Sequence, residues 1–95
     1  MQDEAIAEIG IDGDGRVFIR PASGDYEFVY RAGMEVYWQP AAGRLSHPEV
    51  RSWNPVQWFR QIVAAVASEY GVRLIPTGIT AWSNVPPDVR AEIEA

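Results

Sequence analysis

Apolar and polar residues alternate along the first half of the chain, as they do in half-buried strands. Residues 5–11 are apolar-rich, and the Asp-Gly-Asp-Gly run at 12–15 is typical of a hairpin turn. Further strands are expected at 16–20, 26–31 and 34–39, with 44–46 as a short extension, because runs rich in Pro, Ser and Gly separate them. The pattern therefore predicts a meander of four strands.

Residues 53–58 contain the signals of a helix start. Asn54 is a preferred N-cap, Pro55 suits the first helical position, and Gln57 stands where a capping-box side chain reaches back. Trp53 and Trp58 occupy the two positions of a hydrophobic staple. One apolar stripe follows at spacings of three and four residues, formed by Val56, Phe59, Val63, Val66 and Tyr70. We expect one long helix, from about 55 to 70, across one face of the sheet.

The rest of the chain completes the expected fold. Gly71 is placed to adopt the left-handed conformation that ends the helix, and strands are expected at 72–75 and 79–82. Pro86 and Pro87 delay a short C-terminal helix until about 87. The chain of 95 residues is expected to form one α+β domain over 1–95, with a mostly antiparallel sheet of four to six strands. Core candidates are Ala7, Ile9, Ile11, Val17, Ile19, Val36, Trp38 and Leu74.

Composition narrows the possible functions. A hydrophobic content of 47% and a charged content of 22% indicate a globular domain. The net charge of −5 argues against binding to nucleic acid or to anionic membranes. The start of the chain is acidic rather than basic, and no apolar run approaches the ~20 residues of a membrane span, so a cytoplasmic location is expected.

No group of residues predicts a catalytic or metal site. The acidic run at 12–15 begins like a calcium loop, but Arg16 and Val17 replace the oxygen ligand and the Gly that should follow. There is no Cys, and the one histidine, His47, is expected to be a solvated loop residue although Ser46 and Glu49 stand near it. An enzyme would have to use carboxylate pairs, such as Asp25 with Glu27. We expect no cofactor and no catalysis.

The aromatic residues say more about function. The chain carries four Trp, four Tyr and three Phe. Strand alternation places Phe18 between Arg16 and Arg20, and Tyr37 between Glu35 and Gln39, on the sheet face away from the helix. Exposed rings flanked by Arg and Glu are typical of protein interfaces. The alternative is cross-strand pairing of rings that only strengthens the sheet.

The outer face of the helix is unusually free of charge. Its residues are Gln57, Gln61, Ala64 and Ser68, and no charged residue lies between Arg60 and Glu69. A solvated helix usually carries interspersed charges, so this face is a candidate for packing against a twin subunit. The alternative is an alanine-rich helix selected for helix propensity.

Four segments together resemble small uncharacterised bacterial proteins of mobile gene cassettes, including integron cassettes, and immunity-type proteins encoded beside toxins. The segments are 12–21, 53–60, 69–71 and 80–86. The resemblance covers most of the chain and carries no known active-site residues. It implies a small accessory cytoplasmic protein.

The function expected from these features is a non-catalytic protein-binding module of adaptor or immunity-like type. A homodimer is a further candidate assembly. Its acidic surface would favour a basic partner. The alternative is a small-molecule-binding protein with a pocket between sheet and helix lined by Trp38, Trp58 and Trp82, where Glu35 would anchor a cation. The candidate binding residues are Phe18, Arg20, Glu35, Tyr37, Trp38, Trp58 and Trp82.

Overall fold

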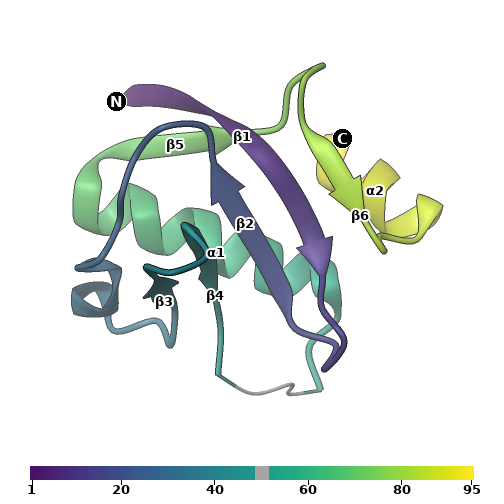
Figure 1. Ribbon diagram of the computed structural model, residues 1–95, viewed down its shortest axis with the longest axis horizontal. Helices are drawn as coiled ribbons and strands as arrows, with labels where there is room; N and C mark the ends of the chain where they lie inside the picture. Colours follow the sequence, from purple (N-terminus) through teal and green to yellow (C-terminus); the bar gives the residue numbers. More distant parts are fainter. Residues whose placement is uncertain (49–51) are drawn as a thin grey trace.

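The computed structural model describes residues 1–48 and 52–95 (Figure 1). Within them the elements follow in the order β1 (Gln2–Ile11), β2 (Val17–Pro21), the 3-10 helix η1 (Val29–Ala32), β3 (Tyr37–Gln39), β4 (Arg44–Ser46), α1 (Pro55–Tyr70), β5 (Val72–Ile75), β6 (Ala81–Ser83) and α2 (Pro87–Glu94). The α+β class, the long helix at 55–70 and the short C-terminal helix are confirmed.

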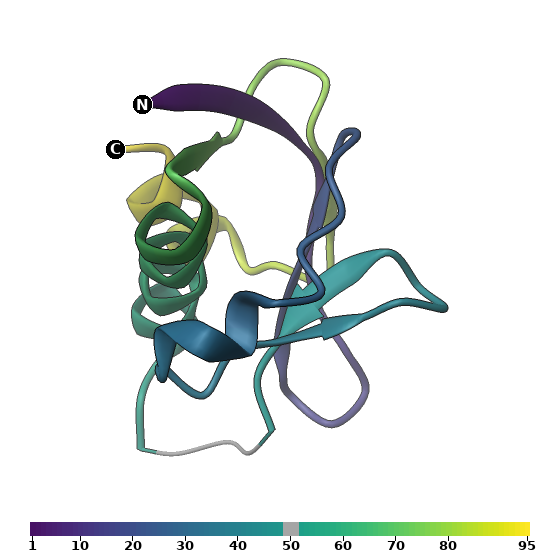
Figure 2. The same cartoon turned by 90° about the vertical axis from the view of Figure 1, so that its left-hand side faces the viewer.

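The strands of the described residues form one mixed sheet in the order β3-β4-β2-β1-β5, with β6 also pairing with β1. The pairings of β1 with β2, β2 with β4 and β3 with β4 are antiparallel, whereas β5 and β6 run parallel to β1. The predicted meander is therefore wrong, because β4 rather than β3 lies beside β2. Between β2 and β3 the chain passes through η1, which packs on α1, and it returns to the sheet only at its outer edge (Figure 2).

A bulge in β1 changes which side chains reach the core. Ile6 pairs with Pro21 and Glu8 with Arg20, so β1 carries one residue more than β2 at this point. The extra residue shifts the alternation of side chains by one. Ile6 and Ile9 consequently both lie in the core although they are three residues apart, and Ala7, a predicted core residue, is only half-buried.

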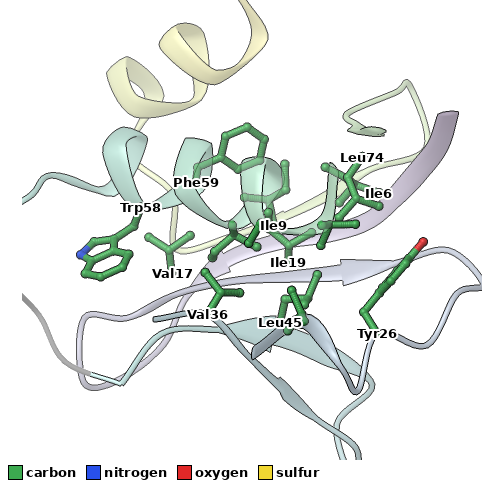
Figure 3. Close-up of a cluster of buried hydrophobic side chains, with 14 residues drawn as sticks. Ile6, Ile9, Val17, Ile19, Tyr26, Val36, Leu45, Trp58, Phe59 and Leu74 are labelled. Atoms are coloured by element: carbon green, nitrogen blue, oxygen red, sulfur yellow. The ribbon is translucent and has the colours of Figure 1, made fainter. Parts of the chain in front are cut away.

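The core lies between the sheet and α1 (Figures 2 and 3). Ile6, Ile9, Ile19 and Leu45 project from the sheet toward Phe59 of α1. Of the other predicted core residues, Val17, Val36 and Leu74 are buried, while Ile11 and Trp38 are partly buried and pack against the cluster.

Helix α1 begins and ends as the sequence predicts. The Asn54 side chain accepts a hydrogen bond from the Gln57 backbone N–H at 3.0 Å, and the Gln57 side chain accepts one from the Asn54 N–H at 2.9 Å. The rings of Trp53 and Trp58 lie 4.8 Å apart, as a hydrophobic staple requires. Gly71 ends the helix in the left-handed conformation with φ 66°.

Two expected strands are wrong or too long. Residues 26–31 form a turn and η1, because Tyr26 and Val29 are both buried and a strand would point residues three apart to opposite faces. The strand expected at 34–39 is limited to 37–39. Gly33 and Glu35 have positive φ angles of 69° and 61°, and this conformation is incompatible with an extended strand.

Candidate functional site

The outer sheet face, away from α1, is more closed than the sequence suggests. Phe18 is only 6% exposed, because its ring covers Gly10 and the guanidinium of Arg44 lies 4.2 Å from the ring centroid. Arg20 is exposed and its Nε donates to Glu8 Oε1 at 3.3 Å. Tyr37 is half-buried on β3. Phe18 therefore does not present its ring to solvent, contrary to the expectation.

The three tryptophans proposed for a small-molecule pocket lie in separate contacts. Trp58 is 2% exposed and packs on Trp53, and among the described side chains its indole N–H is buried without an acceptor. Trp38 meets Tyr26 edge-on at 6.0 Å, and Trp82 lies under the guanidinium of Arg90 at 4.7 Å. These contacts do not bring the three rings together.

An open pocket of about 230 Å³ is present elsewhere, between the β5–β6 loop and α2. Its lining residues are Pro76, Thr77, Gly78, Thr80, Arg90 and Glu94, none of which was a candidate. Glu35 is an exposed residue of the segment between η1 and β3. The small-molecule alternative stays a prediction.

His47 is a structural residue rather than a solvated one, so this expectation is wrong. It is 0% exposed, its ring stacks on Trp58 at 3.9 Å, and its Nε2 accepts the backbone N–H of Val17 at 3.0 Å. Ser46 Oγ donates to the carbonyl of the same Val17 at 2.9 Å. Both side chains thus complete the hydrogen bonding of β2 where β4 ends, while Glu49 lies outside the described residues.

The exposed rings of the described chain gather instead on the turn that contains η1. Phe28 is 44% exposed and Tyr30 is 59% exposed, with ring centroids 6.4 Å apart. The exposed Arg31 places its guanidinium 4.5 Å from the centroid of Phe28. We call these three residues the aromatic patch.

The aromatic patch is held by contacts to three other elements. The Tyr26 hydroxyl donates to Glu4 of β1, and its ring meets Tyr70 of α1 edge-on at 5.0 Å as well as Trp38 of β3. The Tyr70 hydroxyl accepts the backbone N–H of Phe28 at 2.9 Å. Figure 3 shows the Tyr26 ring at one end of the core with its hydroxyl pointing outward. The exposed rings are therefore displayed on an anchored turn.

Glu4 is the charged part of this anchor. Burial alone would raise its pKa, but hydrogen bonds from the Tyr26 hydroxyl and from the backbone N–H groups of Gly24 and Ser23 outweigh burial and hold the pKa below its ordinary value. Burial and the neighbouring Glu4 carboxylate raise the pKa of Tyr26. Glu4 is thus a carboxylate, and Tyr26 a neutral donor, near neutral pH.

Sequence reasoning missed the aromatic patch because aromatic residues favour strands. One signal was available. Tyr26, Val29 and Ala32 recur every third residue before Gly33, which is the period of a 3-10 helix and not that of a strand.

Residues 1–48 and 52–95 contain neither a metal centre nor a membrane-spanning helix. No group of His, Asp or Glu side chains there is arranged to hold a metal ion. No helix there has both the length and the apolar character needed to cross a bilayer.

In comparison with known proteins, a family model and a solved structure indicate the same family. The family model described as Integron Cassette Protein Hfx_Cass5 matches residues 4–80. A solved structure of the integron cassette protein Hfx_Cass5, from the mobile metagenome of the North West Arm sewage outfall, is 42% identical in sequence. The match covers 99% of this chain and 94% of that chain, with a TM-score of 0.52. No curated protein matches the chain.

Proposed function

The chain belongs to the Hfx_Cass5 family of integron cassette proteins, and from this premise we propose that it is a non-catalytic protein-binding module. Its contact surface is the aromatic patch. In this role it acts as an adaptor or immunity-like accessory protein in the cytoplasm, and its partner is another protein.

The observation that carries the proposal is the exposure of two neighbouring rings, Phe28 and Tyr30, beside a stacked arginine. Tyr and Arg are enriched among the residues that dominate binding energy at protein interfaces. Leaving such rings in water has no benefit for folding, since burying them would stabilise the domain.

The rigidity of the turn supports the same function. A surface that is already ordered loses less conformational entropy when a partner binds. The bonds from Tyr26 to Glu4 and from Phe28 to Tyr70 provide this order. The rings of the aromatic patch are therefore prepared for contact before a partner arrives.

A capture experiment with matched variants tests the proposal. The wild-type chain, the double variant Phe28→Ser/Tyr30→Ser, and Ile79→Ser would be immobilised and exposed to soluble proteins of a host that carries the gene. Ile79 is 75% exposed on the β5–β6 loop, so its replacement removes exposed apolar surface away from the patch. We expect a protein retained by the wild type and by Ile79→Ser to be lost from the double variant. Equal retention by all three would refute the aromatic patch as the contact surface.

A further inference from the structure

The turn that carries the aromatic patch has a period of three residues. Backbone N–H groups of Val29, Arg31 and Gly33 donate to carbonyls three residues earlier. Side chains three residues apart lie above one another in such a turn. Tyr26 and Val29 form its buried side, and the Arg31–Phe28 stack at 4.5 Å forms one exposed side.

Glu27 and Tyr30 are also three residues apart, with Glu27 two residues before η1 begins. Both are exposed, and within the described residues Glu27 has no hydrogen bond or ion pair. An unpaired carboxylate therefore stands three residues before the most exposed aromatic ring among the described residues, in the same turn segment.

Guanidinium groups cover other aromatic rings in this molecule. Among the described residues, Arg31 lies over Phe28, Arg44 over Phe18 and Arg90 over Trp82, at 4.5, 4.2 and 4.7 Å from the ring centroids. Tyr30 has no such cation in this part of the chain. A cation is attracted to the face of an aromatic ring, and a carboxylate beside the ring strengthens that attraction.

We propose that Tyr30 and Glu27 form a seat for an arginine side chain of the partner, so that the aromatic patch recognises a basic protein surface. This inference rests on the proposed function and adds the chemistry of the partner. The guanidinium lies over the Tyr30 ring and donates hydrogen bonds to the Glu27 carboxylate. The net charge of −5 attracts a basic surface from a distance, and Glu27 then fixes its position.

Arg31 does not block this seat. Its guanidinium lies over the Phe28 ring, 4.5 Å from the centroid, and leaves the neighbouring Tyr30 ring uncovered. The exposed carboxylate of Asp25 precedes the turn, so the segment 25–31 carries two acidic side chains and one basic side chain. The segment therefore has a net negative charge even with Arg31 included.

A peptide titration of the full chain tests the proposal directly. The probe is the capped peptide Arg-Leu-Arg-Leu-Arg, and the control probe is Glu-Leu-Glu-Leu-Glu, each followed by amide chemical shifts of the ¹⁵N-labelled protein. We expect the arginine peptide to shift amides of residues 27–33 and the glutamate peptide to leave them unchanged. Shifts spread over all acidic segments would overturn the proposal, because they would indicate attraction by net charge alone.

Four variants distinguish specific binding by the Tyr30 ring and the Glu27 carboxylate from attraction by the net charge of the protein. We expect Tyr30→Leu, which keeps an apolar side chain, to weaken arginine-peptide binding by roughly three-fold or more, and Tyr30→Phe to change it by less than about two-fold. Glu27→Gln should also weaken binding by roughly three-fold or more, whereas Glu92→Gln, an equal charge change on exposed α2, should not. Equal effects of the two Glu→Gln variants would remove the proposed seat.

The capture experiment and the titration distinguish failure of the proposed binding function from failure of the arginine seat. If a host protein depends on Phe28 and Tyr30 but is retained equally by Glu27→Gln and Tyr30→Leu, the binding function stands and the arginine seat is wrong. If retention does not depend on the rings, the aromatic patch is not the contact surface of the proposed function, whatever the peptides show.

Discussion

Gly10 and Phe18 lie opposite each other in the pairing of β1 with β2. The Phe18 ring extends over Gly10, and a β-carbon at position 10 would overlap it. The guanidinium of Arg44 also lies over this ring, 4.2 Å from its centroid. At the scale of the single residue, the missing side chain of Gly10 is thus what leaves room for an aromatic ring on the outer sheet face.

Gly10→Ala should destabilise the domain by about 1–3 kcal/mol, since the ring must leave a packed position. Gly13→Ala is the control, because a β-carbon there meets open space. Chemical denaturation measures both. The double variant Gly10→Ala/Phe18→Leu should recover part of the loss, and equal midpoints for the two alanine variants would contradict the explanation.

Glu4 makes a pH-dependent contribution to stability. Its folded-state pKa lies below the ordinary value of 4.5, so the folded state favours the carboxylate. The stabilisation is therefore fully present above about pH 4.5 and is lost as the pH falls through the lower folded-state pKa.

Glu4→Gln should lower the free energy of unfolding at neutral pH and flatten its decline below about pH 4.5. Urea denaturation at a series of pH values measures this, with Glu92→Gln on the exposed face of α2 as the control. A Glu4→Gln curve that runs parallel to the wild-type curve through the acid range would show that the Tyr26 and backbone contacts do not stabilise the carboxylate.

At the scale of the element, α1 is the best specified part of the chain. Its N-cap, capping box, staple and terminal Gly each lie within a few residues of the helix end that they define, and all take the expected geometry. The turn with η1 shows the opposite case. Its local aromatic residues favour a strand, but burial of Tyr26 and Val29 against distant elements makes it a 3-10 turn.

Trp53→Ala should destabilise the domain by about 1–4 kcal/mol, because it removes a partly buried ring from Trp58 and opens the helix start. Trp53→Phe, which keeps a ring in the staple, should lose less than half of that amount. Thermal and chemical denaturation measure the effect. A denaturation midpoint unchanged by Trp53→Ala would mean that the staple contributes nothing.

At the scale of the whole molecule, the sheet is covered on one face by α1 and α2, and the β3–β4 hairpin extends away from them (Figure 2). On the outer face of α1, Gln57, Ala64 and Ser68 are exposed, whereas Gln61 donates to the carbonyl of Met34 at 3.0 Å. Self-association through this face stays a prediction, and Gln61 already makes a hydrogen bond within its own chain.

If two copies pair through this face, Ala64→Glu should convert a dimer into a folded monomer, because two carboxylates would be brought together and lose water near the twofold axis. The monomer should keep its stability, since Ala64 is exposed and Glu is a good helix former. Sedimentation of both proteins decides the matter. A wild type that is already monomeric at micromolar concentration would exclude this interface.

The sequence by itself determined the elements whose signals are local. The limits of α1, the strand at 72–75 and the late start of the second helix follow from caps, periodicity and Pro, which act within a few residues. The alternation of apolar and polar residues also indicated strands in the first half of the chain. Strands followed by one long helix indicate the α+β class.

Only the tertiary structure decided the rest, because contacts between distant residues outweigh local preference. The bulge between Ile6 and Glu8 moved Ile6 into the core, and the passage through η1 placed β4 beside β2. Two of the predicted site residues are buried. Phe18 is covered by Arg44 on the outer face of the sheet, and Trp58 packs against Trp53 and His47 on the face toward α1. The rings left in solvent, Phe28 and Tyr30, could not be identified from their own segment, because distant residues hold this turn. Tyr26 bonds to Glu4, which is 22 residues away along the chain. Phe28 bonds to Tyr70, which is 42 residues away.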